Sequence, residues 1–364
     1  MMKEALLWTN NNVNNNVSCN LCAHRCDIAP NRRGRCAVRI NKNGVLRTCV
    51  YGRVVAQNVD PVEKKPLYHF LPASETFSIA TVGCNFKCVF CQNHGISQAV
   101  EFMGDVDNDK DSDSCNDNRN GNGDVCRDDD LYGGYAMSPR DIVNAAIRYG
   151  CPSVSFTYTE PTVFFEYALD TAEAAKAAGL RTVFVSNGFM TAECLRTAAP
   201  YLDACNIDLK SFRGEFYKER CGAALTPVLE SLRAIREAGI WLEVTTLLIG
   251  GLNDSDEELV DIARFIVNDL GADVPWHVSG FYPRYRMSNA PPTGAAAIER
   301  ACGIGSDAGL RYVYGGNVNI FQDTRCHKCG AVVIRRRGYR TDTAGLAAGG
   351  VCGGCGEKIS GVFF

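Results

Sequence analysis

Residues 83–93 read Gly-Cys-Asn-Phe-Lys-Cys-Val-Phe-Cys-Gln-Asn, and this stretch decides how the rest of the chain is interpreted. Cys84, Cys88 and Cys91 follow a CxxxCxxC spacing, and thiolates are the usual protein ligands of iron–sulfur clusters. A four-iron cluster normally takes four ligands, so three from one loop leave one iron open for chemistry. Residues 76–82 before the loop alternate in the manner of a buried strand. A loop at the carboxyl end of a first strand is where an α/β barrel has its active site.

The composition describes an ordinary globular chain that is rich in cysteine. Of the 364 residues, 46% are hydrophobic and 22% are charged, which is typical of folded domains. The net charge of −3 argues against electrostatic binding to nucleic acid or an acidic membrane, and no apolar run predicts a transmembrane helix. The apolar stretch at the start of the chain is too short, and polar residues follow it too early, for a secretory signal. Nineteen cysteines without such a signal therefore indicate metal binding in a reducing compartment, and we expect a cytoplasmic protein.

Residues 73–320 alternate between strand and helix patterns, which predicts a parallel sheet with right-handed crossovers. Ser138-Pro139 can cap and open a helix ahead of this series. Including the strand before the cysteine loop, six main repeats are present, enough for an open or partial barrel. The expected strands and their following helices are 153–159 with 163–178, 182–186 with 192–199, 204–209 with 227–238, 242–248 with 256–270, and 276–281 with 295–307, before a short strand at 312–314.

Two polar stretches interrupt these patterns. Residues 104–130 contain ten aspartates and almost no large apolar side chain, so they cannot bury enough surface to offset the entropy of ordering. We expect them to form a disordered acidic insertion in the barrel. Residues 10–16 are rich in asparagine, and the same argument predicts a disordered lead-in.

Polar side chains gather where the expected strands end. Such a position would bring a carboxylate, a lysine and small polar groups together at one edge of the sheet. Together they would suit an amino-acid-like ligand with an ammonium group and a carboxylate. The candidate residues are Glu160 after the second strand, Ser186 and Asn187 after the third, Asp208 and Lys210 at the end of the fourth, and His277 on the sixth.

The C-terminal segment, residues 321–364, contains two CxxC knuckles. Cys326 and Cys329 form the first, and Cys352 and Cys355 form the second. This is the pattern of a four-cysteine zinc ribbon. We expect the ribbon to cap the barrel or to dock a protein.

The N-terminal segment, residues 1–72, contains a less regular set of cysteines. Cys19, Cys22, Cys26 and Cys36 fall within 18 residues and open with a CxxC. They are a plausible metal site, either for zinc or for an auxiliary iron–sulfur cluster, and the alternative is a set of reduced surface thiols. An Asn43-Gly44 pair further along predicts a hairpin turn.

The cysteine loop, with the aromatic Phe90 in its last interval, resembles the signature of the radical S-adenosylmethionine (SAM) enzymes. More narrowly, the chain is similar to the radical SAM member of the AmmeMemoRadiSam system, which is related to the pyruvate formate-lyase activating enzymes. This resemblance implies a partial (β/α)6 barrel of the radical SAM type. The matching stretches are 19–39, 60–98, 158–172, 206–210, 243–253, 275–283 and 326–355, which are spread over nearly the whole chain apart from the Asn-rich start and the acidic insertion.

The resemblance also assigns roles to residues. Cys84, Cys88 and Cys91 would bind a [4Fe-4S] cluster, and SAM would chelate its fourth iron, with Phe90 beside the cofactor. Glu160 matches the glutamate of a GGE motif that holds the SAM amino group, although Tyr-Thr replaces the two glycines here.

Further along the chain, the resemblance extends the SAM site to the later strands. Ser186 and Asn187 match the region of the SAM ribose and carboxylate. Asp208 and Lys210 match an Asp-Leu-Lys element over SAM, and His277 matches a histidine near the adenosyl end.

The activity implied by the resemblance is reductive cleavage of SAM. A flavodoxin or ferredoxin would supply the electron, and a 5′-deoxyadenosyl radical would abstract hydrogen from a substrate, with AMMECR-type and Memo-type proteins as partners. One alternative is an activating enzyme for a glycyl-radical enzyme, although the insertion contains only two cysteines where such activases carry a ferredoxin-like insert. The other is a non-enzymatic metal-bearing scaffold, which would not explain the polar strand ends.

Overall fold

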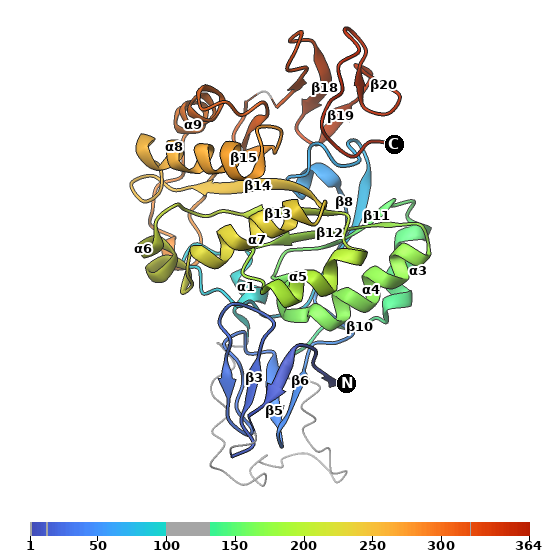
Figure 1. Cartoon of the computed structure of the whole chain (residues 1–364), viewed down its shortest axis with the longest axis vertical. Helices are drawn as coiled ribbons and strands as arrows, with labels where there is room; N and C mark the ends of the chain where they lie inside the picture. The colour runs from blue at the N-terminus through green and yellow to red at the C-terminus, as the bar shows by residue number, and fades with distance from the viewer. Residues whose placement is uncertain (1, 12–13, 100–131, 321) are drawn as a thin grey trace, which may run out of the picture.

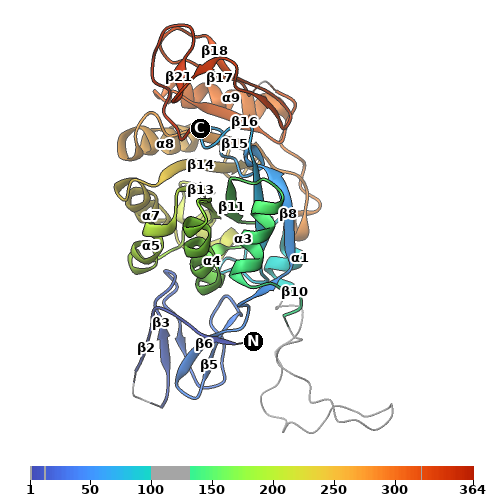
Figure 2. The ribbon, with the colours of Figure 1, turned by 90° about the vertical axis from the view of Figure 1, so that its right-hand side faces the viewer.

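The computed structural model describes residues 2–11, 14–99, 132–320 and 322–364. The expected insertion at 104–130, with Cys115 and Cys126, lies outside these residues. A small N-terminal module and a C-terminal ribbon lie at opposite ends of a central α/β body (Figures 1 and 2). No helix in the described ranges combines the length and the apolar character that crossing a membrane requires.

The central body is built on one eight-stranded sheet with the order β16-β15-β14-β13-β12-β11-β9-β8. All neighbours from β9 to β16 run parallel, and the two edge strands do not pair with each other. This confirms the expected partial barrel. The parallel strands are β9 (Glu75–Ala80), β11 (Ser153–Phe156), β12 (Arg181–Ser186), β13 (Ala204–Asp208), β14 (Trp241–Leu248), β15 (Trp276–Gly280) and β16 (Val313–Gly316).

The edge strand β8 (Ala56–Pro61) was not predicted. It pairs antiparallel with β9 along six residues, from Ala56 opposite Ala80 to Pro61 opposite Glu75. Its exposed residues include Val59 and its buried residue is Asp60, so polar and apolar side chains do not alternate in the period-two pattern that identifies a strand.

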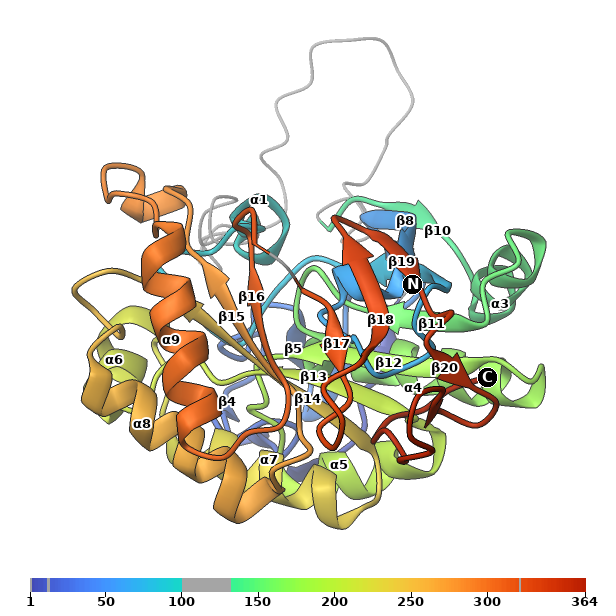
Figure 3. The same cartoon turned by 90° about the horizontal axis from the view of Figure 1, so that it is seen from above.

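The long helices follow one another along the outer side of the curved sheet (Figure 3). Ser138 caps α3 as predicted, because its side chain accepts from the Asp141 amide in a capping box. The long helices are α3 (Pro139–Arg148), α4 (Phe165–Ala177), α5 (Ala192–Ala198), α7 (Thr226–Glu237), α8 (Asp256–Phe265) and α9 (Ala295–Asp307). The short turns are α1 (His94–Ser97), α6 (Gly214–Phe216), η1 (Val62–Lys64), η2 (Pro161–Phe164), η3 (Ala199–Tyr201) and η6 (Tyr285–Met287), with π-helical turns at η4 (Tyr217–Cys221) and η5 (Ile266–Leu270).

The N-terminal module consists of short antiparallel strands. The predicted hairpin is confirmed, since Asn43 and Gly44 both take positive φ between β5 and β6. The Asn-rich stretch is not a disordered lead-in where it is described: Asn10 belongs to β2, and the Asn11 amide donates to the Asn16 carbonyl at 3.0 Å. The strands are β1 (Lys3–Glu4), β2 (Trp8–Asn10), β3 (Val17–Cys19), β4 (Asp27–Ile28), β5 (Arg39–Lys42), β6 (Val45–Thr48) and β7 (Arg53–Val54), which pairs with β10 (Tyr135–Ala136).

The C-terminal ribbon contains two knuckles of the same backbone geometry. In the first, the Gly330 amide donates to the Cys326 carbonyl at 2.9 Å, and in the second, the Gly356 amide donates to the Cys352 carbonyl at 2.9 Å. Both glycines have φ near +75°, which favours a residue without a side chain. The strands are β17 (Thr324–Arg325), β18 (Val332–Arg337), β19 (Arg340–Asp342), β20 (Leu346–Ala347) and β21 (Val351–Cys352).

A buried polar cluster lies near the amino ends of the last strands, and we call Glu243, His277, His69 and Tyr314 the barrel-floor cluster. Glu243 on β14 accepts from His277 Nε2 at 2.6 Å and from the His69 amide at 2.8 Å. His69 Nε2 in turn lies 2.6 Å from the Tyr314 hydroxyl. Arg336 of β18 joins the ribbon to this cluster, because it lies 5.7 Å from the centre of the Tyr314 ring and donates to the carbonyl of Tyr68, the residue before His69, at 2.6 Å.

A buried ion pair fixes the N-terminal module to the barrel. Arg39 on β5 and Glu166 on α4 form a short contact, and each side chain is 1% exposed. The same Glu166 oxygen accepts from the Leu6 amide at 2.6 Å. One carboxylate therefore holds two segments of the module against α4.

We expect Glu166→Ala to lower the free energy of unfolding by about 3–5 kcal/mol, because it leaves the Arg39 charge buried without its partner. Urea denaturation measures the change. Glu173→Ala, on the exposed face of the same helix, should change stability by less than about 0.5 kcal/mol. Equal effects of the two substitutions would show that the buried pair does not hold the module.

His69 should make the protein sensitive to acid. Burial lowers the pKa of His69 to about 4, whereas an unfolded histidine has a pKa near 6.5. The unfolded state therefore binds more protons between these values, and stability is lost as the pH falls from about 6.5 towards 4. At pH 5 the loss from this group should be about 2 kcal/mol.

Thermal or urea unfolding at several pH values tests this expectation. The His69→Gln variant should lose less stability than the wild type between pH 7 and pH 5. Parallel pH dependences in the two proteins would exclude His69 as the cause.

Candidate active site

The cysteine loop follows β9 and is held from two sides. Its backbone pairs with η4, since the Lys87 amide donates to the Cys221 carbonyl at 2.8 Å and the Val89 amide to the Arg220 carbonyl at 3.0 Å. On the other side, Gly83 has a φ of +100°, and a Cβ there would lie 2.6 Å from a methyl of Val38. Glycine is therefore required at the point where the loop leaves the strand.

The three thiols of the loop lie in a mostly buried setting. Cys88 is buried, and Cys84 and Cys91 are half-buried. Burial, and next the charge of Glu160, raise the pKa of Cys84. A hydrogen bond with Cys221 and then burial raise the pKa of Cys88. Such thiols ionise when positive charge is supplied nearby, as a bound metal cluster supplies it.

Lys210 supplies one positive charge to this loop. Its ammonium group donates to Asp208 Oδ2 at 2.8 Å and lies 6.0 Å from the centre of the Phe90 ring. Burial lowers the pKa of Lys210, but Asp208, Cys88 and Cys221 outweigh burial and raise it, so the side chain stays charged. The structure thus brings Asp208, Lys210 and Phe90 together beside the thiols, as the sequence predicted.

Asn187 reaches the loop from the end of β12. Its side-chain amide donates to Asn85 Oδ1 at 2.7 Å and lies 3.8 Å from Cys84 Sγ. Ser186, one residue earlier, is buried and donates to Glu160 Oε1 at 2.7 Å. Both predicted residues are therefore at this site, but they contact it in different ways.

The carboxylate of Glu160 is directed into the protein. Oε1 accepts from the Thr162 amide and hydroxyl at 3.0 and 2.6 Å as well as from Ser186, and Oε2 accepts from the Asn187 amide at 2.8 Å. Burial raises the pKa of this carboxyl. The sequence predicts that Glu160 holds an ammonium group of the ligand, and this stays a prediction; in the structure its carboxylate joins the ends of β11 and β12.

Tyr158 takes the place of a glycine in the expected motif and adopts a glycine-like backbone with a φ of +62°. Its carbonyl accepts from Asn93 Nδ2 at 2.7 Å, and its hydroxyl donates to Asp60 in a short contact. Lys65 lies 4.5 Å from the ring centre, and burial lowers its pKa to about 8. The sequence did not predict this group of Tyr158, Asp60 and Lys65. The one indication of it was the tyrosine that stands where the GGE motif has a glycine.

His277 has contacts with a different set of residues, and its predicted place near the adenosyl end of SAM stays a prediction. It is the second residue of β15, where Nε2 lies 2.6 Å from Glu243 Oε2 and the ring packs against those of Tyr68 and Tyr314. The expected strand covered the right residues, but a period-two pattern does not say how far along a strand a side chain must lie to reach a ligand.

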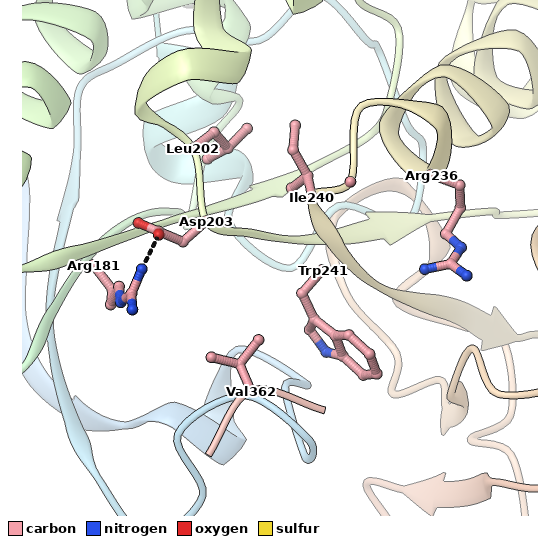
Figure 4. A pocket seen from close by; sticks show the side chains of 8 residues that line it. Arg181, Leu202, Asp203, Arg236, Ile240, Trp241 and Val362 are labelled. Carbon is pink, nitrogen blue, oxygen red and sulfur yellow. Dashed lines mark hydrogen bonds and ion pairs between the residues drawn. The ribbon is translucent and has the colours of Figure 1, made fainter. Parts of the chain in front are cut away.

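A cavity of about 280 Å³ lies at the other end of the strands (Figure 4). It is lined by Arg181 and Trp241, the first residues of β12 and β14, and Arg181 pairs with Asp203 at 2.7 Å. Val362 of the C-terminal segment closes one side. None of the predicted site residues lines this cavity, so the candidate active site remains at the carboxyl ends.

The chain was compared with known proteins. Residues 78–266 match the model of the Radical SAM superfamily. An uncharacterized protein of Methanocaldococcus jannaschii is 38% identical over 98% of this chain and 99% of its own length. The isethionate sulfite-lyase activating enzyme of Desulfovibrio desulfuricans is 26% identical over 44% of this chain and 53% of its own length.

Among solved structures, a domain of pyruvate-formate lyase-activating enzyme from Bacteroides vulgatus is 19% identical, with a TM-score of 0.40, over 45% of this chain and 99% of that domain. The superfamily model covers more than half of the chain, and it spans the three-cysteine loop and the strands from β11 to β14. The chain belongs to the radical SAM superfamily and is a radical SAM enzyme.

Proposed function

We propose that Cys84, Cys88 and Cys91 hold a [4Fe-4S] cluster and that SAM binds the iron that they leave open. The observation that carries this proposal is the set of three thiols on one loop at the carboxyl ends of the strands, with Lys210 and Asn187 beside it. Three thiolates match a cluster that keeps one iron for an external ligand. When bound, the cluster supplies one electron that cleaves SAM into methionine and a 5′-deoxyadenosyl radical, which abstracts hydrogen from a substrate.

The residues of the chain have separate tasks in this proposal. Lys210, held by Asp208, can pair with the carboxylate of SAM, and the Asn187 amide is placed to donate next to Cys84. Glu160 would hold the amino group of SAM and Ser186 would lie in the region of its ribose and carboxylate, and the hydrogen bonds of both residues to neighbouring protein groups would fix their positions. Phe90 is buried in the loop and excludes water from the thiols.

We further propose that the enzyme works with AMMECR-type and Memo-type proteins, and that a flavodoxin or ferredoxin supplies its electron. This proposal rests on the resemblance of the chain to the radical SAM member of the AmmeMemoRadiSam system. That resemblance includes the cysteine-rich segments at both ends of the chain, which lie outside the superfamily match. No disulfide joins the 17 described cysteines, which suits a reducing compartment such as the cytoplasm.

A second candidate function is activation of a glycyl-radical enzyme. The similarity to the isethionate sulfite-lyase activating enzyme favours it. The two candidates differ in what the reaction produces. An activating enzyme leaves a stable glycyl radical on its partner protein, and electron paramagnetic resonance detects this radical after incubation with a candidate glycyl-radical enzyme and SAM.

The cluster assignment is tested by SAM cleavage. Anaerobically reconstituted protein with dithionite should convert SAM into 5′-deoxyadenosine and methionine, and Cys88→Ala should reduce this to background because a ligand is lost. Cys302→Ala, which removes a thiol on α9 outside any cysteine set, should keep wild-type turnover. Liquid chromatography with mass spectrometry measures both products, and continued turnover by Cys88→Ala would refute the assignment.

We also propose that the C-terminal cysteines bind zinc. Cys326 Sγ lies 3.6 Å from Cys355 Sγ, and Cys329 Sγ lies 3.7 Å from Cys352 Sγ. Tetrahedral zinc with bonds of about 2.3 Å requires a sulfur spacing of about 3.8 Å. The four ligand atoms all lie within 4.8 Å of one another.

Metal analysis of the purified protein should find about one zinc per chain. Cys329→Ala combined with Cys355→Ala should remove it and leave the iron content unchanged. Iron in place of zinc at this site, or zinc that survives the double substitution, would contradict the proposal.

A further inference from the structure

Cys19, Cys22, Cys26 and Cys36 of the N-terminal module line one cavity. Cys19 ends β3 and is buried, whereas the other three are half-buried and lie in loops and turns. The cavity holds about 10 Å³, roughly the space that one water molecule needs. Ile28, Val163 and Leu21 form its apolar part. Four thiols from four points of the chain thus converge on one small space.

The spacing of these thiols differs from that of the ribbon. In the described ranges, the C-terminal cysteines are the one group of at least three such ligands whose atoms all lie within 4.8 Å of one another. No three of the N-terminal sulfurs lie within 4.8 Å of one another. Burial raises the pKa of Cys22, and the nearby Cys36 and Cys19 raise it further. Four thiolates placed around one zinc ion would leave no room for a water molecule between them, whereas the N-terminal cavity has about that much space.

The cysteine loop at the active site supplies an internal comparison. Cys84, Cys88 and Cys91 also fail to lie within 4.8 Å of one another. In a four-iron cluster each thiolate binds a different iron, so the sulfurs stand farther apart than around a single ion. By this measure the N-terminal set resembles the active-site loop and differs from the ribbon.

Buried positive charge faces the N-terminal thiols. Arg39 lines the cavity, is 1% exposed, and donates through Nη1 to Cys19 Sγ at 3.2 Å. Its Nε is buried without a hydrogen-bond partner among the described residues. The Arg35 amide lies 3.5 Å from Cys26 Sγ. N–H groups directed at cysteine sulfurs are a recurring feature of iron–sulfur sites, where they tune the cluster.

We propose that Cys19, Cys22, Cys26 and Cys36 ligate a second [4Fe-4S] cluster, separate from the cluster that binds SAM. Four protein thiolates saturate its irons, so this cluster has no open position for SAM. Cys26 and Cys36 are half-buried and lie outside regular elements, and the proposal requires their side chains to turn outward as the cluster enters the small cavity. Arg39 offsets part of the negative charge of the ligands.

The site adjoins the active-site loop. The His24 ring nitrogen Nε2 lies 2.8 Å from the Asn85 carbonyl, and the Ala23 amide donates to the Phe189 carbonyl at 3.0 Å. The Cys36 carbonyl lies 3.2 Å from where a Cβ of Gly83 would be. The second cluster would therefore sit next to the first, with its half-buried ligands towards solvent.

The test counts iron and identifies its form in the anaerobically reconstituted full-length chain. Wild-type protein should contain about eight iron and eight sulfide ions, which Mössbauer spectroscopy assigns to two [4Fe-4S]²⁺ clusters. The triple variant Cys84→Ala, Cys88→Ala, Cys91→Ala should keep about four irons in one such cluster. This variant leaves the N-terminal thiols untouched, and it does not depend on SAM cleavage.

Matched variants in the module complete the test. Cys22→Ala with Cys26→Ala should lose half of the iron, while the remaining cluster still changes its electron paramagnetic resonance spectrum when SAM is added. Cys49→Ala, a buried cysteine of the same module that does not line the cavity, should keep both clusters. A triple variant that binds zinc in place of iron, or that binds no metal, would overturn the proposal.

Discussion

The buried carboxylate of Glu160 is the interaction on which the active end of the barrel depends. It holds the Asn187 amide, and Asn187 holds Asn85 within the cysteine loop. The ends of β11 and β12 and the loop after β9 are thus joined by hydrogen bonds of 2.7–2.8 Å. Loss of one partner would leave a buried polar group unpaired, which costs about 1–3 kcal/mol. A loop that must hold a cluster in one orientation gains its rigidity from this chain of bonds.

The two cysteine-rich segments serve opposite ends of the barrel. The N-terminal module packs under the carboxyl ends of the strands, next to the thiols, whereas the ribbon covers the amino ends (Figures 1 and 2). Arg39 and Arg336 have parallel tasks, since each is 1% exposed and inserts into the body from its own segment. Arg39 pairs with a carboxylate, and Arg336 bonds to carbonyl groups and lies over the Tyr68 ring. The segments are therefore integral parts of the core.

Local patterns predicted most of the fold. The parallel strands, their helices, the hairpin at Asn43 and the cap at Ser138 all follow from residues that are near one another in sequence. The features that were not predicted depend on contacts between residues that are far apart in the sequence. Arg39 and Glu166 are 127 residues apart, and β8 is a strand because β9 pairs with it. No periodicity encodes such pairings.

The candidate site shows the same division. The thiols, Asn187, Asp208 and Lys210 were predicted, and the structure brings them together because strand ends meet at one edge. The contacts of Glu160 with Ser186 and Asn187, and of His277 with Glu243, were not predicted, since they depend on the register of neighbouring strands. The contacts of Tyr158 with Asp60 and Asn93 were not predicted, because both partners are far from it in sequence.

The close fit of Gly83 against Val38 and the Cys36 carbonyl bears on the order of assembly during synthesis. The module and β8 leave the ribosome before the loop that they support, and N-terminal units generally fold first. The loop after β9 therefore emerges next to a surface that is already shaped to receive it. Each later strand then adds to an existing edge, from β11 towards β16. The N-terminal module would thus act as a template for the catalytic loop as well as a support for it.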